Sequence, residues 1–325
     1  MRYCLYILGL VAILFTSCES EIDIDVPVRE PETIVEGYID IGIPPVLLLT
    51  ESSPFFSSVD LESLEDLFIH DATVIVSNNG ISDTLIEVQA DSVREFLRLA
   101  EDSLNLNIDL SLFEEFANLD LSTIPDFNAS FYVSINPLLV GRPNNRYDLR
   151  IETEEGKVLT STTTIPTPTP LDSIFLTPHP DPDNTTQFGL NGSFTDTPNQ
   201  FNAIRYFTQQ NFEPFFPPFF NSVFDDRTFI NADGESFSFA LEIGIPRNQE
   251  IEDFSDSQFL NRGDTARVRW AAIDDEHFAF WSSLEFDRTQ VGNPFGRPTI
   301  ISSNIEGGLG IWGGYASTFE TIIVE

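Results

Sequence analysis

Short runs of β-type residues, separated by glycine, proline and polar turn residues, recur along this chain and limit its fold more than any other feature. Runs of roughly four to eight residues that are rich in Val, Ile, Thr and aromatic residues indicate strands. Asn78, Asn79 and Gly80 stand between two such runs and are typical of a tight hairpin turn. We therefore predict a mainly β protein. The predicted strands are residues 33–40, 45–50, 71–77, 83–88, 131–135, 147–151, 158–165, 173–177, 203–208, 236–243, 265–272 and 318–324.

Two interruptions of this pattern suggest how the chain is organised. Between residues 90 and 126, apolar residues such as Val93 and Phe96 recur at helical spacing, which predicts a helical insertion. Residues 166–170 alternate proline with threonine, and such a segment cannot join a β-ladder continuously. We predict an N-terminal immunoglobulin-like β-sandwich over residues 32–165, a proline-rich linker at residues 166–170, and a second β-rich domain with one helix over residues 171–325.

The one helix of the second domain is expected to begin near Asp274 and Asp275, because carboxylates stabilise a helix N-terminus. Phe278, Trp281 and Leu284 lie at helical spacing, and such a stripe indicates a core face more than a site. The glycine-rich residues 307–314 lack the lysine of a phosphate-binding loop. They fit close backbone packing at the entry to the last strand.

The first residues of the chain have the composition of an export signal. Arg2 precedes an apolar segment, residues 5–15, and small residues follow immediately before Cys18. A helix that spans a bilayer needs about 18 apolar residues or more, so we predict a cleaved signal peptide over residues 1–17. Cys18 resembles the acylated cysteine of a bacterial lipobox, and we predict lipidation there; the alternative is an ordinary signal peptide with an incidental cysteine. Residues 18–31 then form a lipidated acidic tether to a membrane.

The charge of the chain is strongly negative, with 52 acidic and 16 basic residues and a formal net charge of −36. Nucleic-acid binding needs a basic patch that neutralises phosphates, so nucleic acid is excluded as a partner. We favour a surface adapted to a saline medium, in which high ionic strength screens the repulsion among carboxylates. A calcium-loaded acidic surface is the alternative.

The order of several motifs resembles an uncharacterised family of Bacteroidota lipoproteins, a domain of unknown function that is often encoded beside TonB-dependent outer-membrane receptors. This resemblance implies a lipoprotein of the outer membrane that faces the cell exterior and works with a receptor barrel, and it implies no catalytic residues. The acidic residues after Cys18 resemble the export signal for the outer leaflet in such lipoproteins. Residues 90–126 and 212–224 depart from the family. The motifs are residues 18–23, 34–38, 49–55, 72–74, 147–149, 162–166, 263–265, 280–285 and 307–312.

No pattern of residues points to catalysis. His70, His179 and His277 are far apart in the sequence and lack paired metal-ligand spacing, and no nucleophile motif is present. We therefore expect a protein that is not an enzyme and has no resident cofactor. Two loops rich in carboxylates could still hold Ca²⁺, although neither has EF-hand spacing. Their candidate ligands are Asp181 and Asp183 in one loop, and Asp225, Asp226 and Asp233 in the other.

The most unusual segment is a loop rich in phenylalanine and proline. Its prolines prevent a regular strand or helix. One interpretation is that the loop folds back and covers the second core; the other is that its aromatic side chains are exposed and bind a partner or ligand. The candidate binding residues are Phe212, Phe215, Phe216, Phe219 and Phe220.

These observations lead to one functional expectation and two alternatives. We expect a lipoprotein that captures a ligand, or assists in its capture, for a TonB-dependent receptor. An adhesive or structural surface module would explain the β-rich fold and the acidity equally well. A glycan hydrolase would need two carboxylates that converge in a cleft about 5–10 Å apart.

Overall fold

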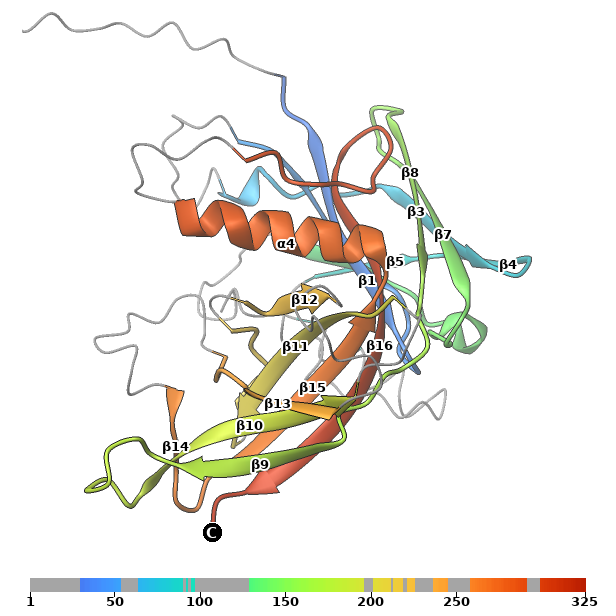
Figure 1. Ribbon diagram of the computed structural model, residues 1–325. Coiled ribbons are helices and arrows are strands. Elements are labelled where there is room, and N and C mark those ends of the chain that lie inside the picture. The colour runs from blue at the N-terminus through green and yellow to red at the C-terminus, as the bar shows by residue number, and fades with distance from the viewer. Residues whose placement is uncertain are drawn as a thin grey trace, which may run out of the picture. The chain divides into compact units, whose positions relative to one another are not determined.

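The computed structural model describes residues 30–53, 64–89, 129–195, 201–211, 213–218, 221–225, 236–244, 258–290 and 299–325, together with Ser92, Glu95 and Phe96. In these residues the chain forms three β-sheets and one α-helix (Figure 1), which confirms the mainly β prediction. The elements are β1 (Thr33–Asp40), β2 (Val46–Glu51), β3 (Thr73–Asn78), β4 (Ile81–Thr84), β5 (Ile86–Gln89), β6 (Ser130–Val133), the 3₁₀ helix η4 (Pro137–Leu139), β7 (Arg146–Glu152), β8 (Val158–Thr164), β9 (Ser173–Pro178), β10 (Gln187–Thr195), β11 (Ala203–Gln210), β12 (Val223–Asp225), β13 (Ser236–Ala240), β14 (Leu260–Asn261), β15 (Thr265–Ile273), α4 (Asp275–Gln290) and β16 (Leu309–Ile323).

The largest sheet has eight strands in the order β12-β11-β15-β16-β1-β2-β6-β5. Its central strands are buried on both faces, because alternate side chains point to opposite sides of a strand. In β1, Val35 and Ile39 belong to the core on one face, whereas Tyr38 belongs to the core on the other. This double burial explains why these strands contain so few exposed polar side chains.

The large sheet joins parts of the chain that the sequence assigns to different domains. β1 pairs in parallel with β16, from Ile34 opposite Leu309 to Asp40 opposite Tyr315. Four strands of the sheet precede residues 166–170 and four follow them. Residues Glu32–Glu325 accordingly form one compact unit. The strands are therefore not divided at residues 166–170 as predicted, because the pairing of β1 with β16 crosses that boundary.

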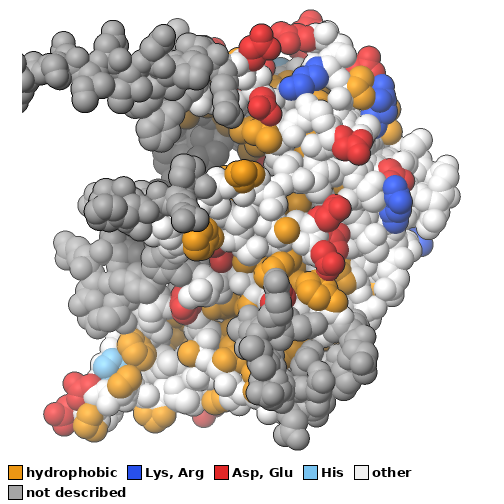
Figure 2. All heavy atoms as spheres, turned by 45° about the horizontal axis from the view of Figure 1, so that its top comes forward, with side chains coloured by type: hydrophobic (Ala, Val, Ile, Leu, Met, Phe, Trp, Pro, Cys, Tyr) orange, Lys and Arg blue, Asp and Glu red, His pale blue; other side chains and the backbone are white. Residues whose placement is uncertain are grey.

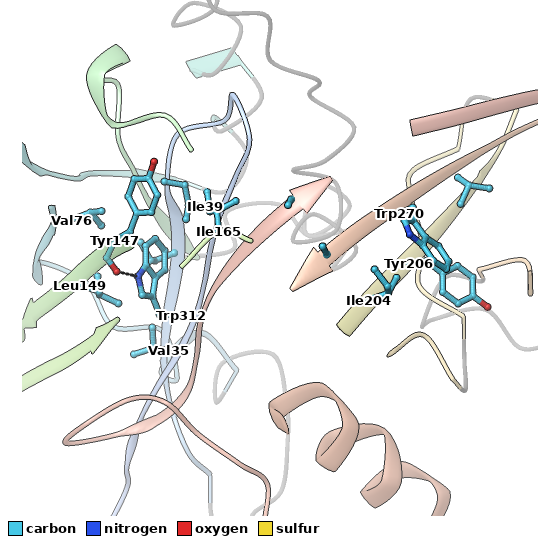
Figure 3. Close-up of a cluster of buried hydrophobic side chains, with 14 of the residues drawn as sticks. Val35, Ile39, Val76, Tyr147, Leu149, Ile165, Ile204, Tyr206, Trp270 and Trp312 are labelled. Atoms are coloured by element: carbon cyan, nitrogen blue, oxygen red, sulfur yellow. Dashed lines mark hydrogen bonds between the residues drawn. The ribbon is translucent and has the colours of Figure 1, made fainter. Parts of the chain in front are cut away.

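Two four-stranded sheets cover one face of the large sheet. One has the order β4-β3-β7-β8, and the other contains β9, β10, β13 and β14. Figure 3 shows Trp312 of β16 packed among Val35, Leu149 and Tyr147, with its indole Nε1 donating to the Tyr147 carbonyl oxygen at 3.0 Å. Trp270 occupies the corresponding core beneath the second small sheet, where it contacts Phe194 and Phe239. A buried tryptophan of the large sheet thus packs against each small sheet, within one core cluster.

The helix α4 lies on the opposite face of the large sheet (Figure 1), where Trp281 packs into the second core cluster. Its N-cap is Asp274, whose carboxylate accepts a hydrogen bond from the His277 backbone N–H at 2.9 Å. The same carboxylate accepts one from the Thr163 hydroxyl at 2.8 Å, which connects the helix to β8. The start of the helix near Asp274 and Asp275 is confirmed. Among the described residues, no helix has both the length and the apolar character needed to cross a membrane.

Other local predictions agree with the structure in part. The hairpin at residues 78–80 is confirmed, since Asn79 and Gly80 have φ angles of 49° and 81° and Asn78 pairs with Ile81. The predicted strand 83–88 is instead two strands, because the chain leaves a small sheet after β4 and enters the large sheet as β5. Sequence patterns also missed β10. Apart from Ser92, Glu95 and Phe96, the predicted helical insertion at residues 90–126 lies outside the described residues.

The glycine-rich run forms the first half of β16 instead of preceding the last strand. A Cβ on Gly310, whose φ is 109°, would lie 1.9 Å from the Val35 carbonyl oxygen. A Cβ on Gly313 would lie 2.4 Å from the His277 ring. The glycines therefore let β16 approach β1 on one side and α4 above it, as close backbone packing predicts.

A buried ion pair connects the first strand to the last two. Arg269 of β15 donates to the Asp40 carboxylate at 3.0 Å, and both side chains are almost completely inaccessible to solvent. The Ser317 backbone N–H donates to the same carboxylate at 3.1 Å, and its hydroxyl donates at 2.5 Å. Asp40 therefore accepts hydrogen bonds from β15 and β16 just where the ladder between β1 and β16 ends.

Replacing Asp40 with asparagine (Asp40→Asn) should destabilise the protein by about 3–5 kcal/mol, because Arg269 would stay buried beside a neutral group. Urea unfolding of both proteins measures this difference. The matched control is Asp148→Asn, which removes an exposed partner of Arg146 and should cost less than about 1 kcal/mol. Equal costs at the two sites would contradict the role assigned to the buried pair.

Neither half of the chain should fold alone. In a fragment of residues 32–165, β1 would lack its partner β16. In a fragment of residues 171–325, β16 would lack its partner β1, so each fragment would expose an unpaired strand edge. We expect cooperative thermal unfolding, followed by circular dichroism, for residues 32–325 but not for either fragment. A cooperative transition in the shorter N-terminal fragment would support the two-domain division instead.

Candidate binding groove

An open groove of about 800 Å³ runs along the side of α4 that faces away from the large sheet. Six of its lining residues come from the helix, at spacings of three and four that place them on one stripe. The others come from residues that precede β11 or follow α4. The lining residues are Phe201, Asp275, Phe278, Ala279, Ser282, Ser283, Phe286, Thr299 and Ser302.

Aromatic side chains give the groove its apolar character. Phe286 is 56% exposed and Phe201 is 49% exposed, although both are large hydrophobic residues. Ile300, next to the groove residue Thr299, is 91% exposed. Exposed apolar side chains that line a groove are a feature of sites for a ligand or partner. The volume also falls within the range of roughly 300–1,000 Å³ that small-molecule sites occupy.

Two of the four hydroxyl side chains that line the groove donate hydrogen bonds within the protein. Ser282 and Ser283 donate to the backbone carbonyl oxygens of Ala279 and Phe280, at 3.3 Å and 2.8 Å. Ser283 also accepts from the Ser302 backbone N–H at 2.9 Å, which fastens the wall of the groove to the helix. The Thr299 Oγ1 atom is buried and has no hydrogen-bond partner in the described part of the chain.

The opposite side of α4 is held to the sheet by buried charged and aromatic groups. The Arg205 guanidinium lies 3.3 Å from the centre of the Trp281 ring, within the range of a strong cation–π contact, and hydrogen-bonds the Tyr315 hydroxyl. Burial, reinforced by the positive charge of Arg205, lowers the pKa of His277 to about 3, so this histidine is neutral at ordinary pH. These contacts fix the helix, and thereby the groove on its other side.

The described surface of the protein carries many acidic side chains. On the face shown in Figure 2, acidic side chains are spread over the described surface and apolar side chains emerge in patches between them. In the groove itself, Asp275 is the one charged residue among the described lining residues.

None of the described residues of the phenylalanine-rich loop is among the lining residues of the groove. Phe215 and Phe216 are buried, at 0% and 5% exposure, and Phe216 exchanges two backbone hydrogen bonds of 2.9 Å with Thr208 of β11. For these two side chains the structure agrees with a loop that covers the core. Phe212, Phe219 and Phe220 lie outside the described residues, so partner binding by this loop stays a prediction.

The predicted calcium ligands are not brought together as a set within the described residues. The Asp181 carboxylate accepts the Asp183 backbone N–H at 3.0 Å, so it stabilises the turn between β9 and β10. Asp225 is 3% exposed at the end of β12, whereas Asp226 and Asp233 lie outside the described residues. No group of three or more His, Cys, Asp or Glu side chains positioned to bind a metal occurs in the described ranges.

His70 belongs to a polar cluster at the edge of the large sheet. Its Nδ1 atom lies 2.7 Å from Glu87 Oε1 and 3.0 Å from the Ser130 hydroxyl, which itself donates to Glu87 at 2.5 Å. A catalytic relay would place serine and carboxylate on opposite ring nitrogens. Here both contact Nδ1, and the buried Nε2 has no partner among the described residues. This geometry fits a clamp on the loop that leads into β3, not a nucleophile.

Glu87 is the centre of this clamp. Burial of the carboxylate favours its neutral form, but hydrogen bonds from Ser130, His70 and the Asp71 backbone N–H outweigh that effect and hold its pKa below the usual value. Asp71 has a left-handed φ of 54°, a conformation that the hydrogen bond to Glu87 helps to hold.

The clamp should make stability depend on pH. Because the pKa of Glu87 is lowered by folding, its contribution is present above the ordinary glutamate pKa of about 4.3 and is lost as pH falls through the folded value. We expect Glu87→Gln to cost about 1 kcal/mol near neutral pH and progressively less in acid, as measured by urea unfolding. Glu152→Gln, at an exposed pair with Arg150, is the control. A cost of Glu87→Gln that does not change with pH would contradict this assignment.

The sequence does contain a sign of the groove, which is a stripe of residues at helical spacing. Periodicity alone does not show whether such a stripe faces a groove or the core. Phe278, Ser282 and Phe286 form one stripe of α4 at a spacing of four, while Trp281 faces the sheet. The sequence does not connect Phe201 with this stripe, because Phe201 is distant from α4 in the sequence and comes near the helix only in the folded protein.

Comparison with known proteins identifies a family but no described activity. The model of a domain of unknown function, DUF4249, matches residues 19–321. None of the curated proteins matches the chain. Since the family model spans most of the sequence, including all but the last two residues of the strands that form the large sheet, this protein belongs to the family of the domain of unknown function DUF4249.

Proposed function

We propose that this protein is an outer-membrane lipoprotein, facing the cell exterior, that captures a ligand or assists in its capture as a partner of a TonB-dependent receptor. The observation that carries the binding role is the open groove along α4, with Phe201 and Phe286 half exposed beside it. Exposed aromatic rings on a fixed helix offer a surface whose burial is favourable without any chemical step.

Burial of the two exposed rings would supply part of the free energy of such a complex. Complete burial of a phenylalanine side chain is worth about 1.5–3 kcal/mol, and two half-exposed rings together offer roughly that amount. Because Arg205 and Trp281 already fix the helix, little conformational entropy is lost when a partner binds.

The membrane attachment is supported by a separate part of the chain. The apolar segment before Cys18 and the acidic residues after it have the order of an exported lipoprotein. An acyl chain at Cys18, with the tether of residues 18–31, would hold the folded unit that begins at Glu32 near a receptor in the same membrane. The surplus of carboxylates is compatible with an external, saline environment.

Affinity purification of the full, lipidated and C-terminally tagged protein from its own outer membrane tests this proposal. We expect a receptor barrel in near-stoichiometric amount, identified by mass spectrometry. The double variant Phe201→Ser/Phe286→Ser should recover at least about tenfold less barrel, because it removes roughly 1.4 kcal/mol or more of apolar contact.

Ile323→Ser provides a matched control for this experiment. Ile323 is 62% exposed at the end of β16 and is not among the lining residues of the groove. Recovery of the barrel should be unchanged in this variant. A wild-type protein that is purified without any barrel, or equal losses in both variants, would overturn the proposal.

A further inference from the structure

We infer that the groove along α4 binds a short, extended peptide that carries apolar side chains and a positive charge. This inference rests on the proposed binding function and names the chemistry of what the groove receives. Its basis is the shape of the groove, the state of its hydroxyl groups and the position of its charge.

The shape of the groove suits a linear ligand. Its helical wall extends from Asp275 to Phe286, and at about 1.5 Å per residue this stretch is about 16 Å long. An extended peptide rises about 3.3 Å per residue, so roughly five residues match this length. The volume of about 800 Å³ is compatible with such a segment and its side chains.

The lining favours apolar side chains over sugars or other ligands rich in hydroxyl groups. Ser282 and Ser283 direct their hydroxyl protons to the helix backbone, so they have no donor left for a ligand. Phe201 and Phe286 instead offer ring faces and edges.

The charge of the groove selects for a cation. Asp275 is exposed at one end, next to Glu276 and the capping Asp274, while no Lys or Arg is among the described lining residues. The partial positive charge of the helix N-terminus, about half a unit, is smaller than the full charge of the Asp275 carboxylate, the one charged group among the described lining residues. With a net charge of −36 on the whole chain, a basic side chain or a free amino terminus is attracted and an anion is repelled.

Binding of peptide pools to the folded protein tests this inference. We would use fluorescent pentapeptides with two aromatic residues and one Lys at the amino-terminal position, measured by fluorescence anisotropy at low ionic strength. Two matched pools replace Lys with Glu, or the aromatic residues with Ser. The Lys pool should bind about fivefold more tightly than the Glu pool, and the difference should shrink at about 0.5 M NaCl. The pool without aromatic residues should bind at least about tenfold more weakly.

Two variants assign this binding to the groove. Asp275→Asn should remove most of the preference for Lys over Glu while retaining affinity for the aromatic residues. Phe201→Ser/Phe286→Ser should weaken every pool that contains aromatic residues, whereas Ile323→Ser should change nothing. Tight binding of the Glu pool, or no binding of any pool, would overturn the inference. The proposed function would survive that result if receptor recovery still depended on Phe201 and Phe286.

Discussion

The fold depends on the contact between Asp40 and Arg269, which joins the first strand to β15 through a pair of buried side chains. Burying two charges is expensive, and the attraction between them offsets the cost only when further hydrogen bonds satisfy both groups. Ser317 supplies such bonds through its backbone and its hydroxyl. The carboxylate also accepts the Ile41 backbone N–H at 2.6 Å, where β1 ends. An apolar residue at position 40 could fill the space, but it would form no directional hydrogen bonds that align β1 with β15 and β16.

The same sheet carries the candidate site on its other face. Arg205 of β11 and His277 of α4 lie between the sheet and the helix, where they contact aromatic rings. The helix is therefore held by closely packed, buried groups. Gly313 is part of this arrangement, because any larger residue would collide with the His277 ring. The groove-lining side of α4 is therefore held in a fixed position relative to the sheet. A groove with few polar contacts can be selective in this setting, since its walls are already in place before anything binds.

Features that depend on residues close together in the sequence were predicted correctly, whereas features that depend on contacts between distant residues were missed. The bounds of β1 and the start of α4 followed from alternation and from Asp274, because both signals lie within a few residues. The pairing of β1 with β16 has no local signal in the sequence. Residues 166–170 therefore suggested a domain boundary, although strands from both sides of these residues pair in one sheet. Prolines correctly excluded regular structure around Phe215, but only the packed core shows that its ring is buried. The groove combines Phe286 with Phe201, and no sequence period connects them.

The central position of β1 has a mechanical consequence. This strand is the first element of the folded unit, and it has neighbours on both sides along most of its length. A force that pulls on Glu32 along the strand would load the ladders to β2 and β16 at the same time, in shear. A first strand at the edge of a sheet would instead be peeled away one hydrogen bond after another. In a protein held from its N-terminal side, a load would therefore enter the fold through a strand that is hydrogen-bonded on both sides.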